Sequence, residues 1–131
     1  MSSTGYFQYN MRTVVHSAWG GVIRIPALLQ GLGARRVLLI SDIGLRDAGI
    51  VDKVVATFET LHSGTAPVLA GVYTDIEPDA GSDSINKCTE YARHVAADAI
   101  LAVGGGSVLD ASKAVKYALH HQILDIGDAL H

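Results

Sequence analysis

The sequence lacks the features that mark most secreted and membrane proteins. Its 131 residues include a single cysteine, Cys88, so no disulfide bond can form within the chain. No apolar run reaches the about 18 residues that a membrane-spanning helix needs, and the opening segment MSSTGYFQYNMR has no apolar signal core. These absences suit a reducing compartment, and we expect a cytoplasmic protein with no membrane partner.

Charged side chains are also scarce. They make up 18% of the chain, compared with about 25% in average soluble proteins, and the formal net charge is −3. There is no stripe of lysine and arginine to neutralise phosphates, so we expect no nucleic-acid partner. Hydrophobic residues make up 49% of the chain, which is enough for one domain with a buried core. The low charge indicates strands that are buried on both faces, or a surface that meets another domain.

Three short apolar segments have the composition of parallel strands. They are residues 37–40, 67–73 and 99–103, and each ends at polar or glycine residues. Continuous apolar runs of this length are typical of strands that are covered on both faces. Residues 13–16 are a candidate for an additional edge strand, and residues 6–9 are a weaker one.

Helical periodicity lies between these strands. Apolar residues spaced three and four apart predict helices over residues 51–61, 85–96 and 109–119. A further helix is expected from Pro26, because the first helical turn accepts proline, to the glycines at 31 and 33. The alternation of helix and strand predicts an α/β fold, with a Rossmann-like parallel sheet and helices on both faces, in a single domain over residues 1–131. Residues 74–83 are predicted to form a loop at the sheet edge where ligands bind in such folds.

A glycine-rich run follows the third predicted strand and opens the last predicted helix. It begins Gly104-Gly105-Gly106-Ser107. The first N–H groups of a helix are unpaired and partly positive, and glycines let a ligand approach them, so the run predicts a phosphate or pyrophosphate site. We expect Ser107 to cap the helix and to donate to a phosphate oxygen.

Two further residues of that helix are candidates for the same site. Asp110 is predicted in the capping-box position, three residues after Ser107. Lys113, one turn farther on, would lend a cation to the mouth of the site.

A plain tight turn is the alternative interpretation of the glycine run. Three consecutive glycines exceed what a turn needs, since each adds a cost in backbone entropy. The run is not the usual dinucleotide fingerprint, because the position of its third glycine holds Leu109, and no Gly-Lys-Ser/Thr follows as in a Walker loop.

The run GGGSVLDASKA resembles the GGGSxxDxAK motif of the iron-containing (group III) alcohol dehydrogenase family. LLISDIGLRDAGIVDKV resembles that family's strand-Asp-x-Gly-helix segment, DIEPDAGSDSINKC takes the place of its PNPT loop, and HSAWGG resembles its N-terminal glycine turn. The resemblance covers most of the chain in the family's order. One departure is Asp79, which stands where the PNPT loop has an asparagine that contacts the cofactor.

The resemblance implies a nicotinamide cofactor and a set of residues that hold it. Its pyrophosphate would be held by Gly104, Gly105, Gly106, Ser107 and Val108. Asp42 would face the adenosine ribose, where a carboxylate accepts from the hydroxyls and repels a 2′-phosphate, so NAD is favoured over NADP. Asp110 and Lys113 would lie toward the nicotinamide. The alternative interpretation of Asp42 is a surface turn residue before Gly44.

The resemblance also implies a longer enzyme. In that family a helical second domain holds a divalent metal, taken to be iron, through one aspartate and three histidines. We therefore expect this chain to be the N-terminal nucleotide-binding part, inactive alone and without catalytic or metal-binding residues of its own. The whole enzyme would transfer hydride between the cofactor and a small alcohol or aldehyde. Its oligomeric state is left open, with a homo-oligomer among the possibilities.

The histidines of the chain do not predict a metal site. His120 and His121 are adjacent, and neighbours on a helix point about 100° apart. Asp125, Asp128 and His131 share one helical face, but they lie at the end of the chain.

Other functions agree with the same pattern. The chain can be a self-standing, non-catalytic nucleotide- or phosphate-binding module of flavodoxin-like architecture. Related nucleotide-binding halves also occur in zinc-dependent glycerol dehydrogenases and in maleylacetate reductases.

Overall fold

The computed structural model describes residues 14–16, 29–31, 33–59, 64, 66–76 and 81–121, with side chains from 29 through 119. The predictions for residues 6–9, Pro26 and Asp79 lie outside this part of the chain, as do those for Asp125, Asp128 and His131. Within it, no helix combines the length and the hydropathy that crossing a lipid bilayer requires.

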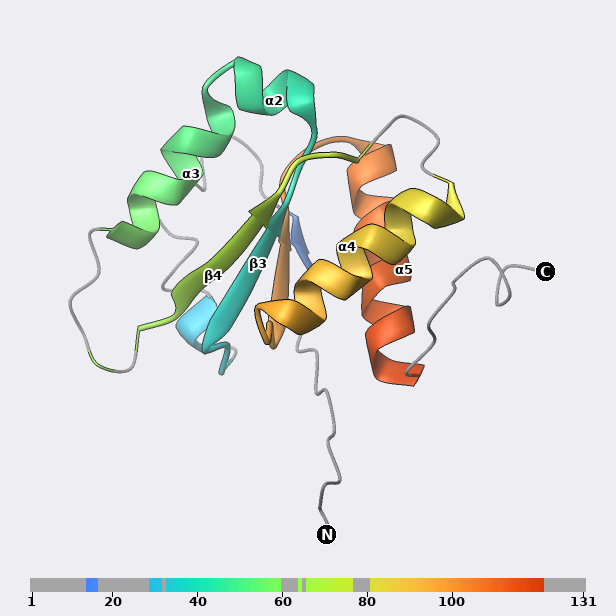
Figure 1. Ribbon diagram of the computed structural model, residues 1–131. Coiled ribbons are helices and arrows are strands. Elements are labelled where there is room, and N and C mark those ends of the chain that lie inside the picture. Colours follow the sequence, from blue (N-terminus) through green and yellow to red (C-terminus); the bar gives the residue numbers. More distant parts are fainter. Residues whose placement is uncertain are drawn as a thin grey trace, which may run out of the picture.

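Parallel strands form a sheet in the spatial order β2-β5-β3-β4 within the described residues (Figure 1). The strands are β2 (Val14–His16), β3 (Arg36–Ile40), β4 (Val68–Tyr73) and β5 (Ala99–Ala102). The helices are α2 (Ile43–Asp47), α3 (Ile50–Glu59), α4 (Ser82–His94) and α5 (Gly106–His121). The predicted strands and the candidate edge strand at 13–16 are confirmed. Helix α2 was not predicted.

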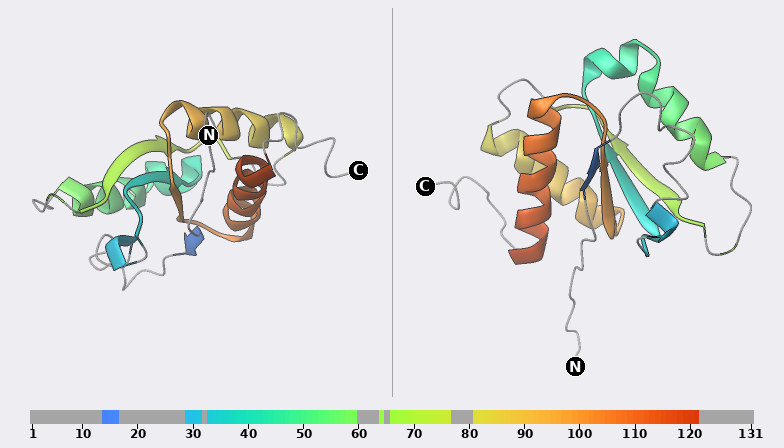
Figure 2. Two further views of the ribbon diagram at one scale, coloured as in Figure 1. Left: turned by 90° about the horizontal axis from the view of Figure 1, so that it is seen from below. Right: turned by 180° about the vertical axis from the view of Figure 1, so that it is seen from behind.

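Strands β3 and β5 are buried on both faces, as their apolar runs predict, whereas β4 is only partly buried and its Val68 is exposed, because β4 lies at the edge of the described sheet. Along β3, Leu38 and Ile40 pack with α4 and α5, whereas Val37 and Leu39 pack with α3. All four side chains are fully buried, and burial of such a side chain contributes about 1.5–3 kcal/mol. Figures 1 and 2 show α3 on one side of the strands and α4 and α5 on the other. The predicted Rossmann-like fold is therefore confirmed.

The order of the strands reverses between β3 and β5. The chain passes from β3 through α2 and α3 to β4, its neighbour on one side, and then returns through α4 to β5 on the other side. Because β3 pairs with β5 as far as Ile40 and Ala102, Asp42 and Gly104 follow just beyond the ends of adjacent strands. Open α/β sheets bind ligands at such a reversal.

The ends of α4 differ from the prediction. The helix begins at Ser82, so the predicted loop ends at Gly81, and Asp83 lies in the first turn, where a carboxylate is favourable. It ends at His94, because Ala96 adopts a left-handed conformation with φ 55°. The amides of Ala96 and Ala97 donate to the carbonyls of Arg93 and Ala92, both at 3.1 Å. This pattern is a Schellman motif, which usually has glycine at the left-handed position.

We expect Ala96→Gly to stabilise the fold, because a left-handed conformation is unfavourable for residues with a Cβ atom. The free energy of unfolding should rise by about 1 kcal/mol in urea denaturation. As a control, Ala56→Gly places glycine at an exposed position within α3 and should lower the same quantity by about 1 kcal/mol. A loss of stability in both variants would show that Ala96 is not strained.

Candidate functional site

A cleft of about 430 Å³ opens at the carboxyl ends of β3 and β5. Residues 42–44 line one side of it and residues 105–108 line the other, together with Ile76 beyond the end of β4. A second hollow, of about 360 Å³, lies at the opposite end of β4 and is lined by Phe58, Val68 and other residues. No predicted site residue lies in that second hollow. The first cleft therefore is the candidate site.

The three glycines of the run 104–106 have different reasons to be glycine. Gly104 has φ +153°, and a Cβ atom there would lie 2.7 Å from Cγ2 of Val108, so the fold itself requires glycine. A Cβ atom at Gly105 or Gly106 would meet no described atom within 4 Å. Packing within the chain therefore explains the first glycine, while the other two leave open space beside the backbone.

The start of α5 presents unpaired amides to this open space. The amide of Leu109 donates to the carbonyl of Gly105 at 3.1 Å, which makes Gly105 the N-cap residue. The amides of Gly106, Ser107 and Val108 precede this bond and have no partner within the helix. They lie at the positive end of the helix dipole. This side of the cleft is therefore suited to an anion.

The prediction that Ser107 caps α5 is wrong. The helix begins one residue after Gly105, so Ser107 lies inside the first turn, with its exposed side chain lining the cleft. Asp110 consequently is not in the capping-box position, which Val108 occupies, but two residues farther along the helix. The reason is that the carbonyl of Gly105 already accepts the first helical hydrogen bond, from the amide of Leu109. The residues after Gly105, including Ser107, are therefore helical.

The predicted site residues are only partly brought together. Those that line the cleft are Asp42, Gly105, Gly106, Ser107 and Val108. Gly104 forms the turn behind them. Asp110 and Lys113 are exposed on α5 and do not line the cleft.

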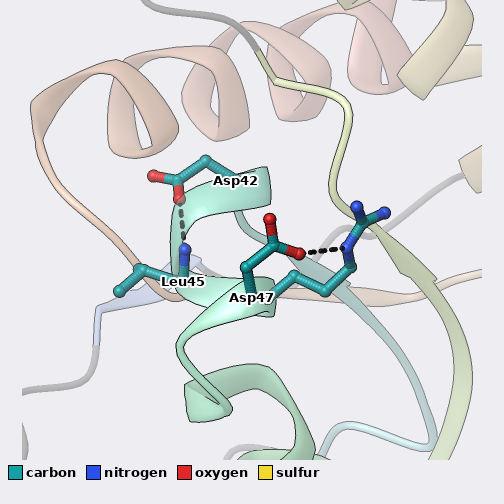
Figure 3. Close-up of polar contacts among 4 residues, drawn as sticks. Asp42, Leu45 and Asp47 are labelled. Carbon is teal, nitrogen blue, oxygen red and sulfur yellow. Dashed lines mark hydrogen bonds and ion pairs between the residues drawn. The ribbon is translucent and has the colours of Figure 1, made fainter.

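Asp42 is the N-cap of the short helix α2. Its Oδ1 accepts a hydrogen bond from the amide of Leu45 at 2.8 Å (Figure 3). A Cβ atom at Gly44 would lie 3.3 Å from this oxygen, so glycine leaves room for the cap. The other carboxylate oxygen points away from the capping bond (Figure 3). Asp42 is thus a helix cap and not an exposed turn residue, and its second carboxylate oxygen takes no part in the capping bond.

The ion pair next to this cap is exposed to solvent and is not part of the candidate site. Arg46 and Asp47 are neighbours whose charged atoms lie 3.4 Å apart, and both side chains are largely exposed (Figure 3). Exposed pairs of this kind contribute little to stability, and neither residue lines the cleft.

Ser41, which the sequence did not single out, lies directly behind the cleft, next to Asp42 in the chain. It is fully buried, and its hydroxyl donates to the carbonyl of Val103 at 2.6 Å. The bond joins the last residues before the two sides of the cleft. A polar residue directly after the apolar run 37–40 was the available signal, but its partner is 62 positions away in the sequence.

Among the described residues, reactive groups of other kinds give no alternative site. Burial raises the pKa of the Cys88 thiol to about 12, so it is protonated at neutral pH and is a poor nucleophile. The described residues hold no group of three or more histidine, cysteine or acidic side chains suited to a metal ion. We therefore derive no metal-dependent step from this part of the chain.

The chain is similar to proteins of one family. A model described as iron-containing alcohol dehydrogenase matches residues 13–130. Long-chain-alcohol dehydrogenase 1 of Geobacillus thermodenitrificans (strain NG80-2) is 33% identical over 106 residues, which cover 80% of this chain and 26% of that protein. The chain thus spans about a quarter of the length of that relative.

Solved structures share the fold. NADH-dependent butanol dehydrogenase A of Thermotoga maritima matches with a TM-score of 0.63 and 25% identity, over 85% of this chain and 27% of that one. Sulfoacetaldehyde reductase of Bifidobacterium kashiwanohense, in complex with NAD+, matches with a TM-score of 0.69 over 96% of this chain and 31% of that one. Its identity is 21%, so this second likeness concerns the fold alone.

The different surroundings of the glycines lead to a stability prediction. Gly104→Ala should lower the free energy of unfolding by about 2–4 kcal/mol, because the new Cβ atom meets Val108 in a strained backbone. Gly106→Ala adds the same atom in open space at the start of a helix, and should change it by less than about 1 kcal/mol. Urea denaturation of both variants measures the difference. Equal losses would contradict the separate reasons given for these glycines.

Proposed function

The chain belongs to the iron-containing alcohol dehydrogenase family, and from this premise we propose that its cleft binds a nicotinamide cofactor within a longer oxidoreductase. The whole enzyme would act on a small alcohol or aldehyde, and a divalent metal, iron in this proposal, would be held by a domain outside this chain. Isolated, the chain would bind the cofactor without turning over substrate.

One observation carries the proposal. Open space lies beside Gly105 and Gly106, at the point where the amides of α5 are unpaired. A diphosphate has closely spaced negative oxygens that need several donors and close approach to the backbone. An anion at a helix N-terminus gains about 0.3–1 kcal/mol, and up to about 2 kcal/mol when it is partly buried. The hydroxyl of Ser107, exposed on the same turn, would donate to a phosphate oxygen.

Asp42 would hold the adenosine ribose from the other side of the cleft. Its capping bond leaves one carboxylate oxygen pointing away from α2 (Figure 3), and that oxygen can accept from ribose hydroxyls. A 2′-phosphate would bring like charge against this carboxylate. We therefore propose NAD rather than NADP as the preferred cofactor, as a dinucleotide-binding carboxylate implies.

The nicotinamide would extend along α5 beyond the diphosphate. Asp110 and Lys113 are exposed on the turns that follow the cleft, and we assign them to that end of the cofactor. Bound NAD accepts or returns hydride. In this proposal the chain binds the cofactor in the cleft between the carboxyl ends of β3 and β5. It also orients the cofactor so that the nicotinamide is accessible from outside the domain.

The proposal predicts that the chain binds NADH. When the chain is titrated with NADH, the fluorescence of NADH should rise at cofactor concentrations below about 1 mM. The residues of this chain alone should suffice for weak binding, without the rest of the longer enzyme. Gly105→Val should weaken binding at least about tenfold by filling the space for the diphosphate. Gly31→Val, at an exposed glycine with open space near the opposite end of the sheet, is the control and should bind as the wild type does.

Each outcome of this titration discriminates between functions. No fluorescence response of the wild-type chain at millimolar NADH would reject the proposal. Binding of inorganic phosphate without any binding of NADH would favour a phosphate-binding module instead.

A second prediction concerns the choice between the two nicotinamide cofactors. Asp42→Asn keeps a side chain that caps helices equally well but removes the charge, so stability should be unchanged. The ratio of NADPH to NADH affinity should rise about tenfold, because repulsion of the 2′-phosphate is lost. Asp47→Asn, an exposed residue outside the cleft, should leave the ratio as it is. An unchanged ratio in Asp42→Asn would remove Asp42 from the ribose site.

A further inference from the structure

We propose that Ser41 is a positioning residue, whose buried hydroxyl sets the distance between the two sides of the cleft. This inference rests on the proposed function, in which one side binds the ribose and the other binds the diphosphate of the same cofactor. A ligand that touches both sides needs them at a fixed separation.

The hydrogen bonds around Ser41 tie three strands together at their carboxyl ends. Its amide donates to the carbonyl of Tyr73, the last residue of β4, at 2.9 Å. Its hydroxyl donates to the carbonyl of Val103, after β5, at 2.6 Å. The amide of Val103 donates to Ile40 at 2.9 Å. With no exposed surface, the hydroxyl has no competition from water, so its bond is retained in the folded state.

The hydroxyl takes the place of a backbone donor that the turn removes. In a continued parallel ladder, the carbonyl of Val103 would accept from the amide of Asp42, because the amide of Val103 already bonds Ile40. The chain leaves the sheet at Asp42 to form α2, so this donor is lost. The side chain of Ser41 supplies it instead, and the connection between β3 and β5 extends one step beyond the backbone ladder.

Because of its position, this bond affects the separation between the two sides of the cleft. Asp42 follows Ser41 directly and Gly105 follows Val103 by two residues, so the two sides begin one and two Cα–Cα steps of about 3.8 Å along the chain from the bond. Gly104 in turn leads to the amides at the start of α5. A shift of Ser41 relative to Val103 therefore changes the separation between the Asp42 carboxylate and those amides.

A second buried hydroxyl-to-carbonyl hydrogen bond, in α4, serves as a control that distinguishes positioning of the cleft from simple stabilisation of the fold. The hydroxyl of Thr89 is also buried and donates to the carbonyl of Ile85 at 2.8 Å within α4. It does not line the cleft. Loss of either hydroxyl leaves a buried carbonyl with one donor fewer, so both losses should destabilise the fold, but only loss of Ser41 should change cofactor binding.

The test compares ligands that reach both sides of the cleft with one that reaches a single side. Ser41→Ala should weaken the binding of NADH and ADP about tenfold, since both ligands bridge the ribose and diphosphate sites, and that of inorganic pyrophosphate less than about threefold. Thr89→Val should lower the free energy of unfolding by a similar amount without changing any of the three dissociation constants. Binding is measured at a temperature at which every variant is fully folded.

Two conservative variants distinguish loss of the hydroxyl from misfolding as the cause of weaker binding. Ser41→Thr keeps the hydroxyl and should restore NADH binding to within about threefold of wild type, whereas Ser41→Cys, a weak donor of similar shape, should lie between alanine and threonine. An equal loss for NADH, ADP and pyrophosphate in Ser41→Ala would overturn the inference, since the hydroxyl would then only support the glycine turn. So would unchanged NADH binding in Ser41→Ala. A wild-type chain that binds no NADH rejects the proposed function as well, and that result does not depend on any Ser41 variant.

Discussion

Three backbone amides at the start of α5 have no partner within their helix, and the form of the site depends on this deficit. The amides of Gly106, Ser107 and Val108 stay accessible because Gly105 and Gly106 place no Cβ atom beside them. Gly104 serves a different purpose, since its unusual φ and its contact with Val108 let the chain turn from β5 into α5. A short run of one residue type thus combines a conformational role with open space beside unpaired amides.

The scaffold brings an acidic group opposite these amides. The reversal of strand order puts the carboxyl ends of β3 and β5 side by side, and the chain diverges from them in opposite directions. Fully buried residues such as Leu38 and Leu39 pack against helices on the two faces of β3. Rigid strands therefore hold Asp42, on the short helix α2, at a defined place across from the start of α5.

The proposed division of labour within a longer enzyme follows from what this chain contains. Its described residues offer donors and one carboxylate for a dinucleotide, but no clustered ligands for a metal ion. The chain also spans about a quarter of a relative's length. In the proposed function, this chain would bind and orient the cofactor, and residues outside it would activate the alcohol or aldehyde.

The parallel α/β fold and the glycine run that opens the last helix were predictable from the amino-acid pattern alone. Both are local properties, because continuous apolar runs mark doubly covered strands and a glycine run before a helix exposes its amides. Only the tertiary structure decided that Gly105 rather than Ser107 caps α5, that α4 ends in a left-handed Ala96, and that Ser41 bonds Val103. At the other end of the sheet, Asp98 likewise accepts from the amides of Arg35 and Arg36. The long-range bonds join residues more than 60 positions apart, and the helix ends depend on backbone angles that tertiary packing selects, so neither leaves a periodic pattern in the sequence.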